Sequence, residues 1–252
     1  MNKIIFFLFS FVLLNCEENL INLNNYSLIW SDNFEEIELD KTKWSHRYVG
    51  KRKLGYTKKE SIQIYDNSLK IIMYKDNNKY CAGMISTENK FEVKYGYFEI
   101  KAKVPYIKGP QVAFWLQSSL FGHGVNNIEK YGVEIDIMEY VYKNKEFIHF
   151  TTHWDGYKDY AKKEHYKVKY PSILDEKWHT FGLVWEENSY SFYIDRILQY
   201  KTYKSISKKK QYLIISAEYT EWGAKVNDKK LPAIFEIDYV RVYKKNKKDH
   251  NE

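Results

Sequence analysis

The sequence predicts an all-β fold, a sandwich of two antiparallel sheets. Short runs of alternating apolar and polar residues recur along most of the chain. The sequence shows no convincing helical periodicity between them, so the helices that would connect parallel strands are not expected. The chain has 252 residues, of which 44% are hydrophobic, and this suits one large β domain. The clearest strands are predicted at residues 61–65, 69–73, 95–105, 111–117, 147–156, 178–185, 190–194 and 235–243.

The N-terminus is expected to direct export. Lys3 precedes a stretch from Ile4 to Leu14 that is almost wholly apolar. This stretch is too short to span a bilayer as a helix and is typical of a signal peptide, which we place at residues 1–15. Because Leu13-Leu14-Asn15-Cys16 resembles a bacterial lipoprotein cleavage box, a lipid-anchored protein is favoured, and simple secretion is the alternative. A membrane contact is expected only through this anchor.

The rest of the chain is expected to form a single unit. Residues 16–25 are predicted to be a short tether, residues 26–245 the domain, and residues 246–252 a basic polar tail. The only cysteines are Cys16 and Cys81. If Cys16 is lipidated, Cys81 is expected to be a small buried thiol, whereas a disulfide requires Cys16 to stay unmodified. We expect a monomer.

The chain carries a net charge of +7 at neutral pH, which raises the question of an anionic partner. Most lysines are scattered, and they cluster only at residues 51–53, 208–210 and 244–248. No nucleic-acid-binding motif surrounds these clusters, so they are interpreted as solvated surface and no nucleic-acid partner is expected.

Three carboxylates fall within the six residues Glu134-Ile135-Asp136-Ile137-Met138-Glu139. Side chains alternate faces along a strand, so Glu134 and Asp136 share one face and the intervening Ile side chains the other. Strict alternation would then bury Glu139 in the core, where an unpaired carboxylate is costly. A one-residue β-bulge at Ile137 or Met138 would return Glu139 to the acidic face, and such bulges are frequent beside active sites.

Close carboxylates that repel one another suggest chemistry that requires them. Glycoside hydrolysis uses one carboxylate as a nucleophile and a protonated one as an acid. Asp136, between the two glutamates, would keep Glu139 partly protonated by like-charge repulsion. Two other interpretations of the run remain open: a solvated acidic strand face and a calcium site.

Two further strands place polar and aromatic residues on one face. Trp115 shares a strand face with the amides of Gln111 and Gln117. A sugar could stack on the indole while the amides form hydrogen bonds with its hydroxyls. The equal alternative is that Trp115 is a half-buried residue of the sandwich without a role in binding. His153 is a candidate to contact Glu134 or substrate, with a purely structural role as the alternative. His153 and His149 are not convincing zinc ligands, because no third ligand stands at a suitable spacing.

Across residues 28–244 the chain resembles glycoside hydrolase family 16. The resemblance rests on motifs in matching order: Trp30-Ser31-Asp32-Asn33-Phe34, Tyr95-Gly96-Tyr97-Phe98-Glu99, Ala113-Phe114-Trp115-Leu116, the acidic run, Trp178-His179-Thr180, and Asp238-Tyr239-Val240-Arg241-Val242-Tyr243. It implies a concanavalin-like jelly roll with substrate in a concave cleft. By motif it makes Glu134 the nucleophile, Glu139 the general acid/base and Asp136 the assisting carboxylate.

The same resemblance extends to other residues. Trp115 implies a sugar-stacking site. Trp222 lies where the family has a late Gly-Gly-x-Trp motif, and it is expected to bind substrate. Glu218 is expected either to face that cleft or to lie on the surface. No cofactor is expected for catalysis. A structural Ca²⁺ is implied on the convex face through Asp238 and backbone carbonyls, with Asn67 standing where a Gly often supplies one of them.

The predicted function is therefore a retaining endo-β-glycosidase acting on a polysaccharide, with β-1,3- or mixed-linkage glucan favoured. Departures from the family pattern, such as Gln111-Val112 where Trp-Pro is common in β-1,3-glucanases, weaken that assignment. An endo-β-galactanase acting on algal or host-type galactans is the close alternative. A non-catalytic glycan-binding lectin is the alternative from another class, since jelly rolls serve lectins too.

Overall fold

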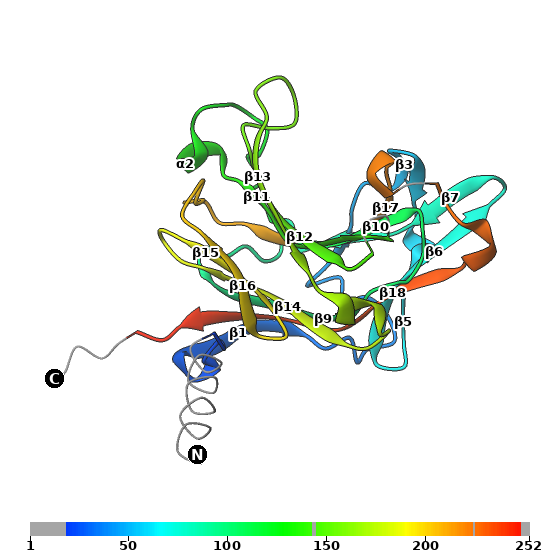
Figure 1. Ribbon diagram of the computed structural model, residues 1–252, viewed down its shortest axis with the longest axis horizontal. Helices are drawn as coiled ribbons and strands as arrows, with labels where there is room; N and C mark the ends of the chain where they lie inside the picture. The colour runs from blue at the N-terminus through cyan, green and yellow to red at the C-terminus, as the bar shows by residue number, and fades with distance from the viewer. Residues whose placement is uncertain (1–18, 143–144, 224, 248–252) are drawn as a thin grey trace, which may run out of the picture.

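The computed structural model describes residues 19–142, 145–223 and 225–247. Most of these residues form two stacked β-sheets (Figure 1). The larger, eleven-stranded sheet contains β1 (Tyr26–Asp32), β3 (Gly50–Arg52), β4 (Gly55–Thr57), β5 (Ile62–Tyr65), β6 (Ser68–Asp76), β7 (Lys79–Ala82), β9 (Gly96–Lys103), β14 (His179–Trp185), β15 (Tyr190–Ile194), β16 (Ile197–Thr202) and β18 (Ala233–Lys245).

The smaller, seven-stranded sheet contains β2 (Ser45–His46), β8 (Met84–Ser86), β10 (Pro110–Gln117), β11 (Glu134–Val141), β12 (Phe147–Trp154), β13 (Lys162–Lys169) and β17 (Tyr212–Tyr219). The helices that the structure describes are short: η1 (Leu23–Asn25), η2 (Lys59–Ser61), α2 (Ile128–Tyr131), η4 (Pro171–Leu174), η5 (Glu221–Gly223) and η6 (Asp228–Lys230). None of the described helices is long and apolar enough to cross a membrane.

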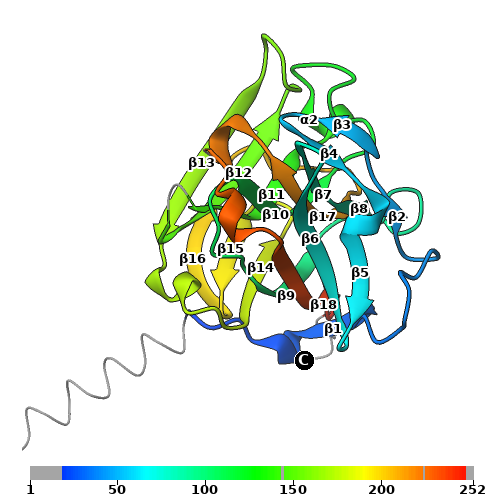
Figure 2. The ribbon, with the colours of Figure 1, turned by 90° about the vertical axis from the view of Figure 1, so that its right-hand side faces the viewer.

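Strand order brings segments that are distant in sequence together. The path β16-β15-β14-β9-β18-β6-β7-β4-β3 crosses the larger sheet, with β1 beside β18 and β5 beside β6 (Figure 2). The smaller sheet runs β13-β12-β11-β10-β17-β8-β2. The pairings between these strands are antiparallel except β4 with β7. This is the predicted jelly-roll sandwich, and each predicted strand has a counterpart whose bounds differ by a few residues.

The apolar faces of the two sheets pack against each other to form the core. From β10 the core takes Val112, Phe114 and Leu116, whereas Ala113 and Trp115 on the opposite face belong to a separate small cluster with Met84, Tyr212 and Ile214. This division follows the period of two along a strand. The outer face of the seven-stranded sheet is therefore free to carry a polar site above a rigid support.

Residues 19–25 of the predicted tether form backbone hydrogen bonds with the domain. The amide of Ile21 donates to the carbonyl of Arg196, and Leu198 donates back to Asn19, so this segment is bonded to the turn between β15 and β16. Backbone groups that pair with a turn are held in place, which a sequence of polar residues does not reveal. Cys16, the predicted signal peptide and most of the predicted tail lie outside the described residues. Cys81 is a buried free thiol.

Candidate active site

A one-residue bulge in β11 places three carboxylates on one face of the sheet. Along β10, the alternate residues Ala113, Trp115 and Gln117 pair with Glu139, Asp136 and Glu134 respectively. Four steps on β10 thus oppose five on β11, and Ile137 is the extra residue. A matching shift occurs against β12 between Asp136 and Glu139. The predicted bulge is confirmed, and it buries both Ile137 and Met138 in the core.

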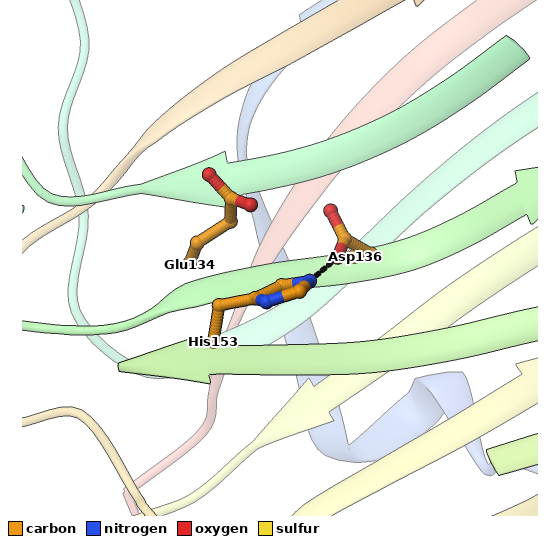
Figure 3. Close-up of side chains that lie close together, drawn as sticks. All are labelled: Glu134, Asp136 and His153. Carbon is orange, nitrogen blue, oxygen red and sulfur yellow. Dashed lines mark ion pairs between the residues drawn. The ribbon is translucent and has the colours of Figure 1, made fainter. Parts of the chain in front are cut away.

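The three carboxylates lie at the floor of a cleft of about 610 Å³. Only 6% of Glu134, 5% of Asp136 and 9% of Glu139 is exposed, yet all three line the cleft. Figure 3 shows Glu134 and Asp136 projecting from the same side of β11. The other lining residues come from the hairpin β3–β4, from β10, β12 and β17, and from the segments that follow β12 and β17: Arg52, Lys53, Gln111, Ala113, Trp115, His153, Tyr157, Ser216, Glu218, Thr220, Glu221 and Trp222.

Glu134 is held by an amide whose orientation is itself fixed. Gln117 Nε2 donates to Glu134 Oε2 at 2.7 Å. Gln117 Oε1 accepts hydrogen bonds from the Tyr212 hydroxyl at 2.7 Å and from Arg47 Nη2 at 2.9 Å, so its amide nitrogen must face Glu134. The Tyr157 hydroxyl also donates to Glu134. We expected Gln117 to bind substrate, but the structure shows it positioning this carboxylate.

Glu139 has an equivalent arrangement at the other end of β10. Gln111 Nε2 donates to Glu139 Oε1 at 2.7 Å, and Thr151 Oγ1 donates to Oε2 at 2.8 Å. The Thr220 hydroxyl donates to Gln111 Oε1 at 3.0 Å and so fixes that amide. The two glutamate carboxylates are therefore each aimed by an oriented glutamine of the same strand, which is the preorganisation that a catalytic pair requires.

Burial and mutual repulsion raise the pKa of each of the three acids. Burial, followed by the nearby charge of Asp136, raises the pKa of Glu139 to about 8. Burial also raises the pKa of Glu134, although His153, Tyr157 and Gln117 oppose that rise. The pKa of Asp136 lies well above its ordinary value because of burial and the charge of Glu134. Glu139 is thus protonated at neutral pH, as a general acid must be.

His153 contacts Asp136. Its Nε2 lies 3.4 Å from Asp136 Oδ2 (Figure 3), and it is paired across the sheet with Glu134. Ligand atoms of Glu134, Asp136 and His153 all lie within 4.8 Å of one another, a spacing that a metal ion could also bridge. Glu134, however, is already bonded to Gln117 and Tyr157. The arrangement therefore suits a proton network among buried acids.

Two tryptophans and Glu218 take the places expected of cleft residues. Trp115 lines the floor and its Nε1 donates to Ser216 Oγ at 3.1 Å, which fixes the indole. Trp222 lines the cleft and packs edge-on against His149, with ring centroids 4.8 Å apart. Glu218 also lines the cleft, where Arg52 pairs with it. Two aromatic rings in a polar cleft are suited to stacking sugars.

The sequence does not indicate two residues that shape the site, Tyr157 and Arg52, and for Gln111 it indicates a sugar contact and not the bond to Glu139. Gln111 shares a strand face with Trp115 and Gln117, and that signal placed it in the cleft without assigning it to Glu139. Tyr157 lies in the loop after β12, where the sequence has no periodic pattern that would predict the direction of a side chain. It is 63% exposed, although its hydroxyl donates to Glu134. Arg52 belongs to the hairpin β3–β4, which is distant in sequence from the acidic run.

The residues predicted to hold calcium do lie together, on a face separate from the cleft. Asn67 and Asp238 line a surface pocket of about 570 Å³ that also includes Glu35 and Lys101. Carboxylate and amide oxygens are ligands that Ca²⁺ accepts. The ammonium of Lys101, however, lies 2.7 Å from Asp238 Oδ2 and already neutralises that carboxylate. The oxygens of Asp238 and Asn67 could therefore hold a calcium ion only if the Lys101 side chain moves away from Asp238.

Comparison with known proteins agrees with this geometry. Residues 49–241 match the family described as glycosyl hydrolases family 16. A keratan-sulfate endo-1,4-β-galactosidase of Sphingobacterium multivorum is 28% identical, over 87% of this chain and 56% of its own length. A glucan endo-1,3-β-glucosidase A1 of Niallia circulans is 26% identical, over 86% of this chain and 38% of its own length.

Among solved structures, a laminarinase from Flavobacterium sp. UMI-01 superposes with a TM-score of 0.72 and 26% identity. That match covers 86% of this chain and 100% of the laminarinase chain. The chain spans only about half or less of the two relatives above, but the matched family region contains the bulged strand, both positioning glutamines and both cleft tryptophans. The chain belongs to glycosyl hydrolase family 16.

Proposed function

We propose that this protein is a retaining endo-β-glycosidase that cleaves internal linkages of a β-linked glucan or galactan. The observation that carries the proposal is the bulge in β11. It directs the side chains of Glu134 and Glu139 into the same cleft, where each accepts a hydrogen bond from its own oriented glutamine. The open cleft and its two tryptophans support binding within a chain rather than at a chain end. The names of the two relatives support both sugar types.

The contacts suggest how the two steps proceed. An oxygen of Glu134 attacks the anomeric carbon, and the bond to the leaving sugar breaks while Glu139 gives its proton to the leaving oxygen. A covalent glycosyl-enzyme results. Glu139, now ionised, takes a proton from water, the water oxygen attacks the same carbon, and Glu134 departs. Two inversions at one carbon retain its configuration.

The test is release of reducing ends from a panel of polymers: laminarin, mixed-linkage glucan, agarose-type galactan and keratan-type galactan. We expect early products to be oligosaccharides of mixed length, as internal cleavage gives. Binding to a polymer without turnover of any panel member would favour a lectin instead. The jelly roll admits a lectin, but the oriented acids would then have no purpose.

Gln111 provides a test of how Glu139 is tuned. Its hydrogen bond favours the ionised form of Glu139, so Gln111→Ala should raise the pKa of Glu139 further. The alkaline limb of the kcat/KM profile should then move to higher pH, by about half to one pH unit. The exposed amide Gln63 supplies a control, and Gln63→Ala should leave the limb in place. A limb that moves to lower pH would contradict the assignment.

We propose that Ca²⁺ and Lys101 compete for Asp238. Lys101→Met would free the carboxylate, so millimolar Ca²⁺ should raise the Tm of that variant by about 2–4 °C more than it raises the Tm of the wild type, equivalent to about 1 kcal/mol of binding. Differential scanning calorimetry with Ca²⁺, Mg²⁺ and EDTA measures this. Equal shifts in both proteins would contradict competition at this pocket.

We further propose that residues 1–15 direct export and that Cys16 carries the lipid that holds the enzyme at the cell surface. The support is the apolar run from Ile4 to Leu14 followed by Cys16. The intact mass of the protein extracted from membranes tests this. A chain that begins at Cys16 with an added lipid mass is expected, and a chain that retains residues 1–15 would contradict export.

A further inference from the structure

A second pocket, of about 670 Å³, lies beside the catalytic cleft and is strongly basic. Its walls carry the ammonium groups of Lys108, Lys145, Lys225 and Lys230 and the rings of Tyr106 and Tyr142. Among the described residues no Asp or Glu lines it. A concave site with four positive charges and no lining carboxylate is built to attract an anion.

Three chain segments run from the catalytic cleft directly into this basic pocket. Gln111 lines the cleft and Lys108 the pocket, Glu139 lines the cleft and Tyr142 the pocket, and Trp222 lines the cleft and Lys225 the pocket. Each pair is three residues apart, about 10 Å where the chain is extended. The basic pocket therefore continues the cleft on the side of Glu139, within reach of an oligosaccharide bound across the acids.

The segments that form the pocket are bonded to one another. Gly109 donates to the carbonyl of Gly223, and Asn227 donates to the carbonyl of Lys108 at 3.3 Å. A Cβ on Gly109 would lie 2.7 Å from a methyl of Val226, so the two segments pack with no space for a side chain there. Lys108 is thus carried on backbone that is bonded to the segment that carries Val226 and Asn227.

The lysines of the basic pocket are not paired with carboxylates, whereas many other lysines of the chain are. Lys75 is paired with Asp228, and Lys101 with Asp238. Within the described part of the chain, none of the four pocket lysines forms an ion pair. Asp228, which follows the lining residue Asn227, is bonded to Lys75 and Tyr80, and Lys225 adds a weaker electrostatic attraction to it. These charges are therefore available to a ligand.

The two tyrosines form an aromatic wall in the same pocket. Their ring centroids are 4.7 Å apart and their hydroxyls 3.1 Å apart. Lys230 Nζ lies 5.0 Å from the Tyr106 ring centroid, and Lys108 Nζ lies 5.8 Å from that of Tyr142. Aromatic faces accept the apolar face of a sugar, while ammonium groups take its charged substituent. Together they suit a charged sugar better than a free ion.

We propose that this basic pocket binds a sulfate ester on a sugar unit of the substrate chain, beyond the bond that Glu139 protonates. The proposal rests on the proposed glycosidase function and narrows its substrate class to sulfated polysaccharides. A sulfate ester remains ionised at any pH at which the enzyme works and offers several acceptor oxygens. Several separate ammonium groups can meet such a tetrahedral oxyanion from different sides, each acting as a point charge.

The experiment compares one sulfated galactan with the same polymer after chemical desulfation. The double variant Lys108→Gln/Lys225→Gln removes two pocket charges, and Lys229→Gln/Lys247→Gln removes two charges from exposed lysines outside the pocket. We expect the pocket variant to lose about tenfold in kcat/KM on the sulfated polymer, mostly through KM, with little change on the desulfated one. The control variant should match the wild type on both.

Salt and free anions complete the test. The preference of the wild type for the sulfated polymer should shrink as ionic strength rises from about 0.01 to 0.15 M, and the pocket variant should show little such dependence. Millimolar inorganic sulfate, the other source of this anion, should inhibit far less than a sulfated oligosaccharide, because it lacks the sugar that the tyrosines contact.

The proposal is overturned if the pocket and control variants lose equal activity, if the pocket variant loses as much on the desulfated polymer, or if inorganic sulfate inhibits as well as the oligosaccharide. Those results would leave the glycosidase standing, since turnover of the desulfated polymer is measured in the same series. Failure of the wild type to cleave any polymer would instead overturn the glycosidase function itself.

Discussion

Glu134→Ala is expected to lower kcat on a polymeric substrate by at least about 10³-fold while leaving the fold intact. The variant removes the group that attacks the anomeric carbon, and the general acid alone cannot form the covalent intermediate. Substrate binding should change little, because Trp115 and Trp222 remain in the cleft. The measurement is reducing-end release together with a binding titration on the same oligosaccharide.

The space left by the missing carboxyl makes this variant informative. Azide is small enough to replace the nucleophile, and it should restore part of the activity on a substrate with a good leaving group. Because one displacement then replaces two, the glycosyl azide should have inverted configuration. Glu129→Ala, which alters an exposed carboxylate on α2, is the control and should keep full activity. A β-configured azide product would contradict the role of Glu134.

Glu139→Ala is expected to lower activity on unactivated polysaccharide by about 10²–10⁴-fold, the usual contribution of a general acid. With an aryl glycoside whose leaving group needs no proton, the first step should remain fast and the glycosyl-enzyme should accumulate. A burst of phenol release followed by a slow steady state would show this. Equal losses on both kinds of substrate would contradict an acid role for Glu139.

The pH profile should change with the same substitution. In the wild type, Glu139 must hold its proton for the first step. We therefore expect kcat/KM to be high at pH values below the pKa of Glu139, which is about 8, and to fall as the pH rises through that value. Glu139→Ala should abolish this alkaline limb. The acidic limb should lie above the ordinary range of glutamate, because burial raises the pKa of Glu134, which must be ionised to attack.

The bulge could be predicted from sequence because it follows from a conflict. Three acids separated by apolar residues cannot all leave the core on a regular strand, and one extra residue resolves this with little disturbance. The structure places that residue at Ile137. The division of β10 into a core face and a cleft face was predictable for the same reason, since burial on one side fixes the register of a strand.

Contacts between distant segments could not be predicted in this way. Tyr157 reaches Glu134 from a loop, and Arg52 reaches Glu218 from a hairpin of the other sheet. Neither has a periodic signal, because loop direction is set by tertiary packing. The hydrogen bond from Gln117 to Glu134 could not be predicted either, because sequence alone does not show that Tyr212 and Arg47 fix its amide. Lys101 was missed at Asp238 for the same reason, since the two meet only across paired strands.

Glu134 is expected to become covalently bound to the sugar during each catalytic cycle. A substrate analogue with fluorine at sugar carbon 2 and a good leaving group slows the second step, and peptide mass spectrometry then finds the labelled residue. One added glycosyl group is expected, on Glu134, and it should be lost on incubation with an acceptor. A glycosyl group on another residue, or turnover of the analogue with inverted product and no label, would contradict it.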